Sequence, residues 1–352
     1  MKKYLLKGRL LLCCFLVLAG VAVQAGPAEA GIFTMSTKDE IKNGKNYARQ
    51  LEKKFGLVQD LELQERVARI GDRIAAVSDR KDVPYTFKVL NGKDVNAMAL
   101  PGGYIYVFKG LIDYMPSDEE LAGILAHEVG HVAKRHIAKQ VEKAMNMQVA
   151  AILLHAERLG IFGNLIEMAI MQGYSREDER EADQLGFIYS LRAGYNPYGM
   201  LMGLQKLNQL DPTGESDIFS SHPDSQSRVD AIEAQMREAG IQPRVIRGEK
   251  SAEIADDGLK LPPLYATYRG NKPYYRACLA AGTLYQLAKI PEFSGDYFIL
   301  DSDGTYITVL YDTRPVITLT PQDAIANGTA LEELANEYVL ALKTWADRRK
   351  AD

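Results

Sequence analysis

The segment LAHEVGHVAKRH, residues 125 to 136, contains two histidines four positions apart, with a glutamate directly after the first. An α-helix turns about 100° per residue, so His127 and His131 would share one helix face, about 6 Å apart along its axis. Two imidazoles so arranged can bind one Zn²⁺ at about 2.1 Å, with Glu128 beside them to take a proton from a water on the metal. The segment therefore predicts a helix that carries a zinc site.

The residues before this segment contain the signals that begin a helix. Ser117 follows Pro116, and Glu120 lies three positions later, which is the capping-box pattern that satisfies free N–H groups in a first turn. HEVGH is therefore expected inside a helix that begins near Ser117. Within that helix, Gly130 is expected to keep the surface open near the metal.

The surrounding sequence predicts a mainly helical domain with a short sheet. Residues 37–78 have apolar side chains at three- and four-residue steps, which indicates helix. Residues 85–111 change to a strand pattern, with strands around Phe87 and at residues 104–108, so we expect a β-hairpin about a Pro-Gly-Gly turn. Residues 144–173 are strongly apolar, but charged side chains interrupt them. We therefore expect a buried or cleft-covering helix there and no membrane span.

A catalytic zinc site requires a third protein ligand. One class of zinc peptidase supplies a histidine six residues after the second one, and this chain has Ile137 there, so that class is excluded. His136 is five positions after His131, roughly 140° around the same helix, so we expect its side chain to point elsewhere. We interpret His136 and His155 as ordinary helix residues.

The segment SREDEREAD, residues 175 to 183, offers several carboxylates on a helix that Ser175 is expected to cap. Glu179 and Asp183 lie four positions apart and share a face, which suits a metal ligand and an acceptor for a histidine N–H. A solvated acidic face is an equally good explanation of so many charges. The residues alone leave both interpretations open.

Four segments together resemble the HtpX and CAAX-prenyl-protease (Ste-type) family of gluzincin zinc metallopeptidases in their order and spacing. They are NAMALPGGYIYVFKGL, HEVGH, YSREDEREAD and SHPDSQSR, within residues 37–240. The soluble periplasmic BepA-like and LoiP-like members are the most similar. BepA-like members continue into helical repeats after the peptidase domain, whereas this chain has the strand pattern of a different domain there.

This resemblance implies one Zn²⁺ per chain, bound by His127, His131 and Glu179. Asp183 matches the final position of the family pattern E-x-x-x-D, and Glu128 matches the residue that moves protons. The resemblance thus selects Glu179 among the carboxylates of its segment.

The resemblance also implies residues that contact the substrate. His222 and Arg228 match a family segment near the metal, where one of them would hold the oxyanion or the substrate. A further hypothesis is that His222 occupies the open position of the metal until substrate displaces it. An extended peptide would add as a strand along Asn96, Ala97, Met98 and Ala99.

The N-terminus predicts export. Four basic residues precede an apolar run from Leu10 to Val23, and the small-residue pattern around Ala25 suits signal cleavage. The run has 14 residues, short of the ~20 that a membrane anchor requires, and Val21 stands where a lipoprotein signal would have cysteine. We interpret residues 1–25 as a signal peptide and expect a soluble, most simply periplasmic, protein that is not a transmembrane protein.

The net charge excludes one class of partner, and the cysteine content bears on the role of the remaining thiol. Without the signal, 38 basic and 46 acidic residues remain, a net charge of −8, which argues against nucleic acid. Cys278 is then the one remaining thiol, and we expect it to be a buried apolar residue.

The C-terminal third predicts a second unit. Residues 247–263 are polar and rich in turn residues, which suits a linker or a domain boundary. Three strand-like segments follow, in YFIL, TYITVLY and VITLT, and then a helix from Thr329 with Glu332 in its cap. We expect a small α+β domain that could bind a partner.

We thus predict an α+β protein, with a zincin-type metallopeptidase domain at residues 26–245 and the small domain at 246–352. The expected activity is hydrolysis of polypeptide substrates, with misfolded or unassembled envelope proteins implied by the family resemblance. The alternative is a zinc-stabilised, chaperone-like module that holds unfolded chains and rarely cleaves. An intact Glu128 argues against it, because a structural site needs no base.

Overall fold

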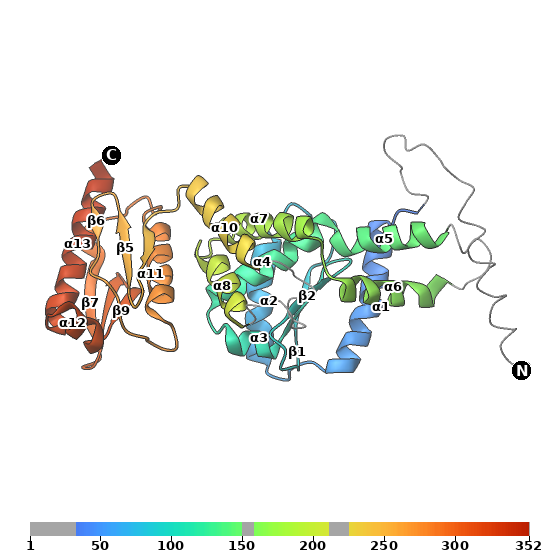
Figure 1. The fold of residues 1–352 in the computed structure, drawn as a ribbon, viewed down its shortest axis with the longest axis horizontal. Helices are drawn as coiled ribbons and strands as arrows, with labels where there is room; N and C mark the ends of the chain where they lie inside the picture. The colour runs from blue at the N-terminus through green and yellow to red at the C-terminus, as the bar shows by residue number, and fades with distance from the viewer. Residues whose placement is uncertain (1–32, 150–157, 211–224, 352) are drawn as a thin grey trace, which may run out of the picture. The chain divides into compact units, whose positions relative to one another are not determined.

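A short sheet lies beside the helix that carries HEVGH (Figure 1). The computed structural model describes residues 33–149, 158–210 and 225–351. The sheet has the order β1-β3-β2, in which β1 (Thr86–Leu90) is parallel and β2 (Ala97–Leu100) antiparallel to β3 (Tyr104–Phe108). The predicted hairpin is therefore β2–β3, and joining the strand around Phe87 directly to β3 was wrong. The strand β2 contains Ala97 to Ala99, three of the four residues along which an extended substrate was expected to add.

Two helices precede this sheet, as the apolar pattern of residues 37–78 predicted. They are α1 (Thr37–Phe55) and α2 (Leu61–Ala75), separated at Gly56, which has a φ of 72°. Val67, Ile70 and Ile74 are fully or almost fully buried, and α2 packs against β1 and α4. The first core of the protein therefore lies between these helices and the sheet.

The HEVGH helix, α4 (Asp118–Lys134), follows the short α3 (Lys109–Tyr114). The Ser117 hydroxyl accepts a hydrogen bond from the Glu120 N–H at 3.2 Å, which confirms the predicted start. The helix ends at Arg135, whose backbone is left-handed with a φ of 61°, and α5 (His136–Val149) begins at the next residue. The break redirects the chain immediately after the HEVGH segment.

Helices α5 and α6 (Arg158–Gln172) pack on each other (Figure 1). The expectation of a buried helix within residues 144–173 holds for one face of α6. Leu165 and Ile166 are buried, whereas Met168 and Met171 are 57% and 75% exposed. Among the described residues, no helix combines the length and the apolar character that crossing a bilayer requires.

The acidic segment forms the start of α7 (Arg176–Arg192), which Ser175 caps in a reciprocal box with Asp178. Helices α4 and α7 pack closely because glycines stand at their contact. A Cβ on Gly130 would lie 2.9 Å from the Ala182 carbonyl oxygen, and one on Gly186 would lie 3.0 Å from the His127 nitrogen. The expectation that Gly130 opens the helix surface was wrong, because α7 covers it.

We expect Gly130→Ala to lower the free energy of unfolding by about 1 kcal/mol, because overpacking costs about 1–3 kcal/mol and the better helix propensity of alanine returns about 1. Zinc affinity should fall as well, because α7 carries Glu179. Denaturant unfolding and chelator competition measure the two effects. Gly163→Ala on α6 is the control, since its added Cβ meets nothing closer than 3.8 Å. An equal response of both variants would contradict the packing role.

Among the described residues, α8 (Gly199–Leu210) and α10 (Ser225–Glu238) follow α7. The stretch predicted as a linker then forms an antiparallel sheet of β4 (Arg244–Arg247), β5 (Ala252–Asp256) and β6 (Leu259–Lys260). The linker interpretation was wrong because Ala252 and Ile254 alternate with polar residues and are buried.

The C-terminal part confirms the small α+β arrangement. Strands β7 (Phe298–Ser302), β8 (Ile307–Tyr311) and β9 (Arg314–Leu319) form an antiparallel sheet beside α13 (Leu331–Ala351). Two helices and a turn were not predicted: α11 (Pro273–Leu287), α12 (Pro321–Asn327) and the 3₁₀ turn η1 (Gly295–Tyr297). Before α13, the Thr329 hydroxyl donates to Glu333 instead of Glu332. Cys278 is fully buried, as expected, and burial raises the pKa of its thiol.

Candidate metal centre

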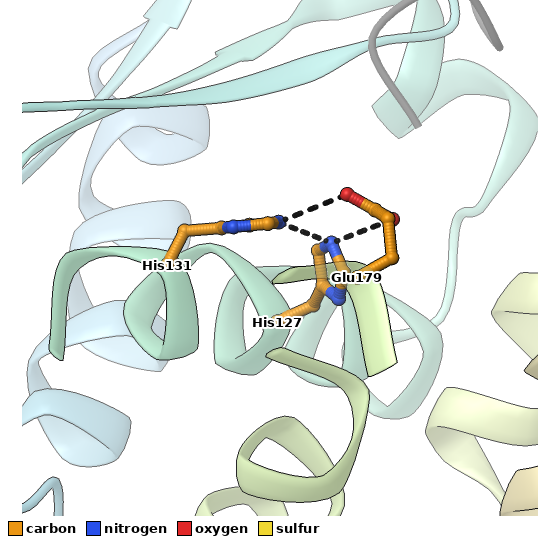
Figure 2. A group of neighbouring side chains, drawn as sticks. All are labelled: His127, His131 and Glu179. Atoms are coloured by element: carbon orange, nitrogen blue, oxygen red, sulfur yellow. Dashed lines mark hydrogen bonds and ion pairs between the residues drawn. The ribbon is translucent and has the colours of Figure 1, made fainter. Parts of the chain in front are cut away.

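Three side chains from two helices meet at one point (Figure 2). His127 and His131 extend from α4, and Glu179 reaches them from α7. The Nε2 atoms of the histidines are 2.9 Å apart, and the Glu179 carboxylate oxygens lie 3.3 Å from His131 Nε2 and 3.6 Å from His127 Nε2. All three side chains are buried. In the part of the chain that the structure describes, this is the group of His, Cys, Asp and Glu side chains that could hold a metal ion.

These distances fit a zinc ion. Tetrahedral ligands at about 2.0–2.1 Å from Zn²⁺ lie about 3.3 Å from one another. The observed separations of 2.9, 3.3 and 3.6 Å bracket that value. Two imidazole nitrogens and one carboxylate oxygen are also a ligand set of catalytic zinc, which leaves one position for water or substrate. The residues present therefore suit the metal that the sequence predicted.

His127 has a carboxylate behind it. Its Nδ1 lies 2.9 Å from Asp183 Oδ1, so the N–H can sit on Nδ1 and leave the Nε2 lone pair facing Glu179. Arg228 on α10 holds Asp183 through two hydrogen bonds of 2.7 Å, and its Nη1 lies 2.6 Å from Glu179 Oε2. The guanidinium thus joins the metal-facing carboxylate to the outer one.

The charges of this buried group are coupled. Burial would raise the pKa of Asp183, but the charge and hydrogen bonds of Arg228, with His127, lower it to about 2. Burial would likewise lower the pKa of Arg228, but Glu179 and Asp183 raise it. Asp183 therefore remains an anion that can hold His127 at any ordinary pH.

Arg228 was expected to hold the oxyanion or the substrate. In the structure its guanidinium is 7% exposed and binds Asp183 and Glu179. These contacts are those of a residue that orients carboxylates, and an oxyanion contact by Arg228 remains a prediction. His222 and His155 lie outside the described residues.

His131 has a different outer partner, which the sequence interpretation dismissed. The Nδ1 atoms of His131 and His136 are 2.7 Å apart, and His136 Nε2 lies 3.1 Å from Glu181 Oε2. His136 was expected to point elsewhere because α4 was extended past it. The helix ends at Arg135, so that extrapolation was wrong. Burial lowers the pKa of His136, partly offset by Glu181 and Asp178, which favours its neutral form.

An aromatic ring also supports His131. Tyr174 stacks on it with ring centroids 3.6 Å apart and an interplanar angle of 16°. Sequence reasoning missed this contact, since Tyr174 precedes the cap of α7 and no pattern distinguishes it from a core residue.

Glu128 is buried on α4 next to His127. Its charge contributes to the raised pKa values of Tyr174 and Arg228, so it belongs to the same electrostatic group. A buried carboxylate beside two metal-facing histidines is where a general base for a bound water would stand.

The predicted substrate strand is an edge of the first sheet. Asn96 accepts a hydrogen bond from the Phe108 N–H at 3.0 Å, and Ala97 to Leu100 pair with β3. Alternation along this antiparallel pair directs the N–H and C=O groups of Ala97 and Ala99 away from β3. The β2 strand also packs against α4, which carries the metal-facing histidines.

We expect Asp183→Asn to weaken zinc binding by roughly 10- to 100-fold, as loss of an outer partner of a ligating histidine does. The amide has one acceptor oxygen where the carboxylate has two, so its NH₂ group would face an N–H donor of Arg228 or of His127. Chelator competition measures the affinity. Glu177→Gln is the matched control on α7, because its side chain is exposed and contacts no member of the group. Unchanged affinity in Asp183→Asn would remove Asp183 from the site.

Comparison with known proteins agrees with this geometry. The family model "Peptidase family M48" matches residues 62–236, which contain α4, α7 and most of α10. A second model, described as a domain of unknown function (DUF8459), matches residues 253–348.

Relatives support the same assignment. The chain is 28% identical over 244 residues to the beta-barrel assembly-enhancing protease of Escherichia coli (strain K12), covering 63% of this chain and 48% of that protein. It is 33% identical over 167 residues to the metalloprotease LoiP of the same strain, covering 45% and 66%. It is 31% identical over 183 residues to the mitochondrial metalloendopeptidase OMA1 of Schizosaccharomyces pombe, covering 50% and 54%.

The chain thus spans about half the length of the first of these curated relatives. The match nevertheless includes every segment that carried the predicted family resemblance up to Arg228, and it confirms that resemblance. Through the domain at residues 62–236, the chain belongs to peptidase family M48.

Proposed function

We propose that this chain is an exported zinc metalloendopeptidase that hydrolyses peptide bonds in misfolded or unassembled envelope proteins. The observation that carries the proposal is the buried meeting of His127, His131 and Glu179 at separations that suit tetrahedral zinc. Membership of a peptidase family and the metalloprotease names of several relatives support the reaction type.

In the proposed peptide hydrolysis, each step is assigned to a residue of the buried group. Zn²⁺, when bound, supplies a Lewis acid that lowers the pKa of a water and polarises a carbonyl. Glu128 then accepts a proton from the attacking water at its carboxylate and delivers it to the nitrogen of the leaving amine. Asp183, through His127, keeps one ligand ring in the tautomer and orientation that binding requires. Arg228 neutralises part of the negative charge that Glu179 and Asp183 bring into the buried site.

The edge strand β2 suits an extended substrate. A peptide that pairs with Ala97 and Ala99 would run along the side of the sheet that packs on α4. Pairing of this kind uses the backbone of the substrate, so it requires an unfolded segment more than a particular side chain. We therefore propose that Asn96 to Ala99 bind substrate and that the enzyme selects unfolded regions.

The envelope as the site of action is supported by the export signal predicted at residues 1–25 and by one relative's name. The E. coli relative is called a beta-barrel assembly-enhancing protease, a name that links that protein to the assembly of β-barrels. We propose a periplasmic location for this chain and retain the division into residues 26–245 and 246–352. The second of these parts is proposed to bind a partner.

The test is incubation of the purified chain with unfolded casein and with an unfolded β-barrel protein, followed by mass spectrometry of the products. We expect internal peptides, loss of cleavage in a chelator and recovery when zinc is restored. The same β-barrel protein in its folded state is the matched control and should remain intact. Binding of the unfolded chain with zinc present and no cleavage would instead support the chaperone-like alternative.

A further inference from the structure

We propose that His136 is a positioning residue for His131, and that it fixes this ligand by accepting the proton of its second ring nitrogen. The inference rests on the proposed zinc site and adds a residue that the metal-binding pattern does not contain. It also assigns a role to Glu181, which lies two positions after Glu179 on α7. Glu181 contacts His136, whereas Glu179 faces the metal position.

The proton positions follow from the distances. A histidine that binds zinc through Nε2 has its lone pair there, so its proton must be on Nδ1. His131 Nδ1 lies 2.7 Å from His136 Nδ1, which must then act as acceptor. The proton of His136 is therefore on Nε2, which donates to Glu181 Oε2 at 3.1 Å. One chain of hydrogen bonds thus sets both tautomers.

The hydrogen bond between His131 and His136 matters for zinc binding because both rings are buried. His131 and His136 are each 2% exposed, so water does not readily replace either partner. Without an acceptor at residue 136, the Nδ1 proton of His131 would be unsatisfied in a dry site. The ring could then turn or change tautomer, and either change removes the Nε2 lone pair from the metal position.

The charge of the site explains why a neutral partner suits this position. Glu128, Glu179 and Asp183 are buried in the group, and Arg228 is the cation that contacts two of them. A further buried carboxylate behind His131 would add repulsion at low dielectric. The imidazole of His136 instead transfers the interaction to Glu181, whose side chain is 39% exposed and can be solvated.

A second ion network holds His136 in place. Arg135 has a left-handed backbone, and its side chain is bound by Glu40 at 2.5 Å and by Glu142 at 2.9 Å. Glu40 on α1 is fully buried and also accepts from Arg80, which donates to the carbonyl of Val132 at the end of α4. These contacts fix the turn between α4 and α5 that brings His136 back to His131.

The experiment compares His136→Phe with His136→Asn in the full chain. Phenylalanine keeps a planar ring without an acceptor, whereas the asparagine oxygen can occupy the place of Nδ1. We expect zinc affinity, measured by chelator competition, to fall roughly 10- to 100-fold in His136→Phe and to recover most of that loss in His136→Asn. The visible spectrum of the Co²⁺-loaded protein should change in His136→Phe and resemble wild type in His136→Asn.

Lys143→Ala, at an exposed position of the same helix, is the control and should match wild type in both measurements. Unfolding of the metal-free variants separates a general loss of stability from a specific loss of zinc. Wild-type affinity in His136→Phe, or equal losses in the Phe and Asn variants, would overturn the positioning role while leaving the zinc peptidase intact. A wild-type chain that binds no zinc would instead overturn the proposed function itself.

Discussion

Replacing Glu128 with glutamine should abolish peptide cleavage while zinc remains bound. The amide has nearly the shape of the carboxylate but cannot accept the proton of the attacking water, and general base catalysis contributes about 10²- to 10⁴-fold. Glu128 lies beside His127 on α4 and is not among the three side chains that converge on the metal position. Cleavage of an unfolded protein and zinc content of the same sample measure the two effects.

Glu62→Gln, at an exposed position of α2, is the control for the loss of a glutamate charge and should cleave as wild type does. Two outcomes would remove Glu128 from the role of base. One is full activity of Glu128→Gln, and the other is loss of zinc from it, which would mean that Glu128 is a ligand.

Replacing Glu179 should have an equally large effect, but on the metal. Glutamine removes the anionic ligand and the partner of Arg228 Nη1, which lies 2.6 Å from Glu179 Oε2. Arg228 would keep its two hydrogen bonds to Asp183, but the metal would lose its anionic protein ligand, so zinc retention should be almost abolished. Metal analysis after dialysis against a weak chelator measures this loss.

Glu181→Gln is the comparison on α7, because Glu181 contacts His136 and is not among the side chains that converge on the metal position. Its amide oxygen can still accept from His136, so zinc should be largely retained. If zinc survived Glu179→Gln but was lost from Glu181→Gln, the wrong face of α7 would have been assigned to the metal.

The positions of the helices could be predicted because their ends carry local chemistry. Ser117 and Ser175 each cap a helix, and these caps place HEVGH and Glu179 on α4 and α7. Geometry within each helix then predicts the shared face of His127 and His131. That α7 should meet α4 is a long-range fact, and only the family resemblance favoured Glu179 over a solvated acidic face.

His136 could not be found in this way. Its contact depends on Arg135, which ends α4 in a left-handed conformation that non-glycine residues seldom adopt. No glycine or proline marks the break, and the distant Glu40 helps to hold it. A prediction that continues α4 through His136 therefore places its side chain on the wrong side.

The close packing of α4 on α7 at Gly130 could not be predicted either, because it also depends on residues distant in the sequence. Gly130 lies in the metal-binding segment, so chemistry was the natural explanation for it. The nearby backbone of Ala182 supplies a simpler one, and it comes from 52 positions further along the chain. Residues 247–263 were interpreted as a linker but contain strands β5 and β6. Short strands with few apolar residues resemble a linker in sequence.

The zinc site is tested most directly by diffraction from crystals of the zinc-loaded chain at energies on both sides of the zinc absorption edge. We predict one anomalous peak per chain, about 2.0–2.1 Å from His127 Nε2, His131 Nε2 and a Glu179 carboxylate oxygen. No peak at this position, or a zinc ion held by other side chains, would contradict the assignment of the metal centre and the mechanism built on it.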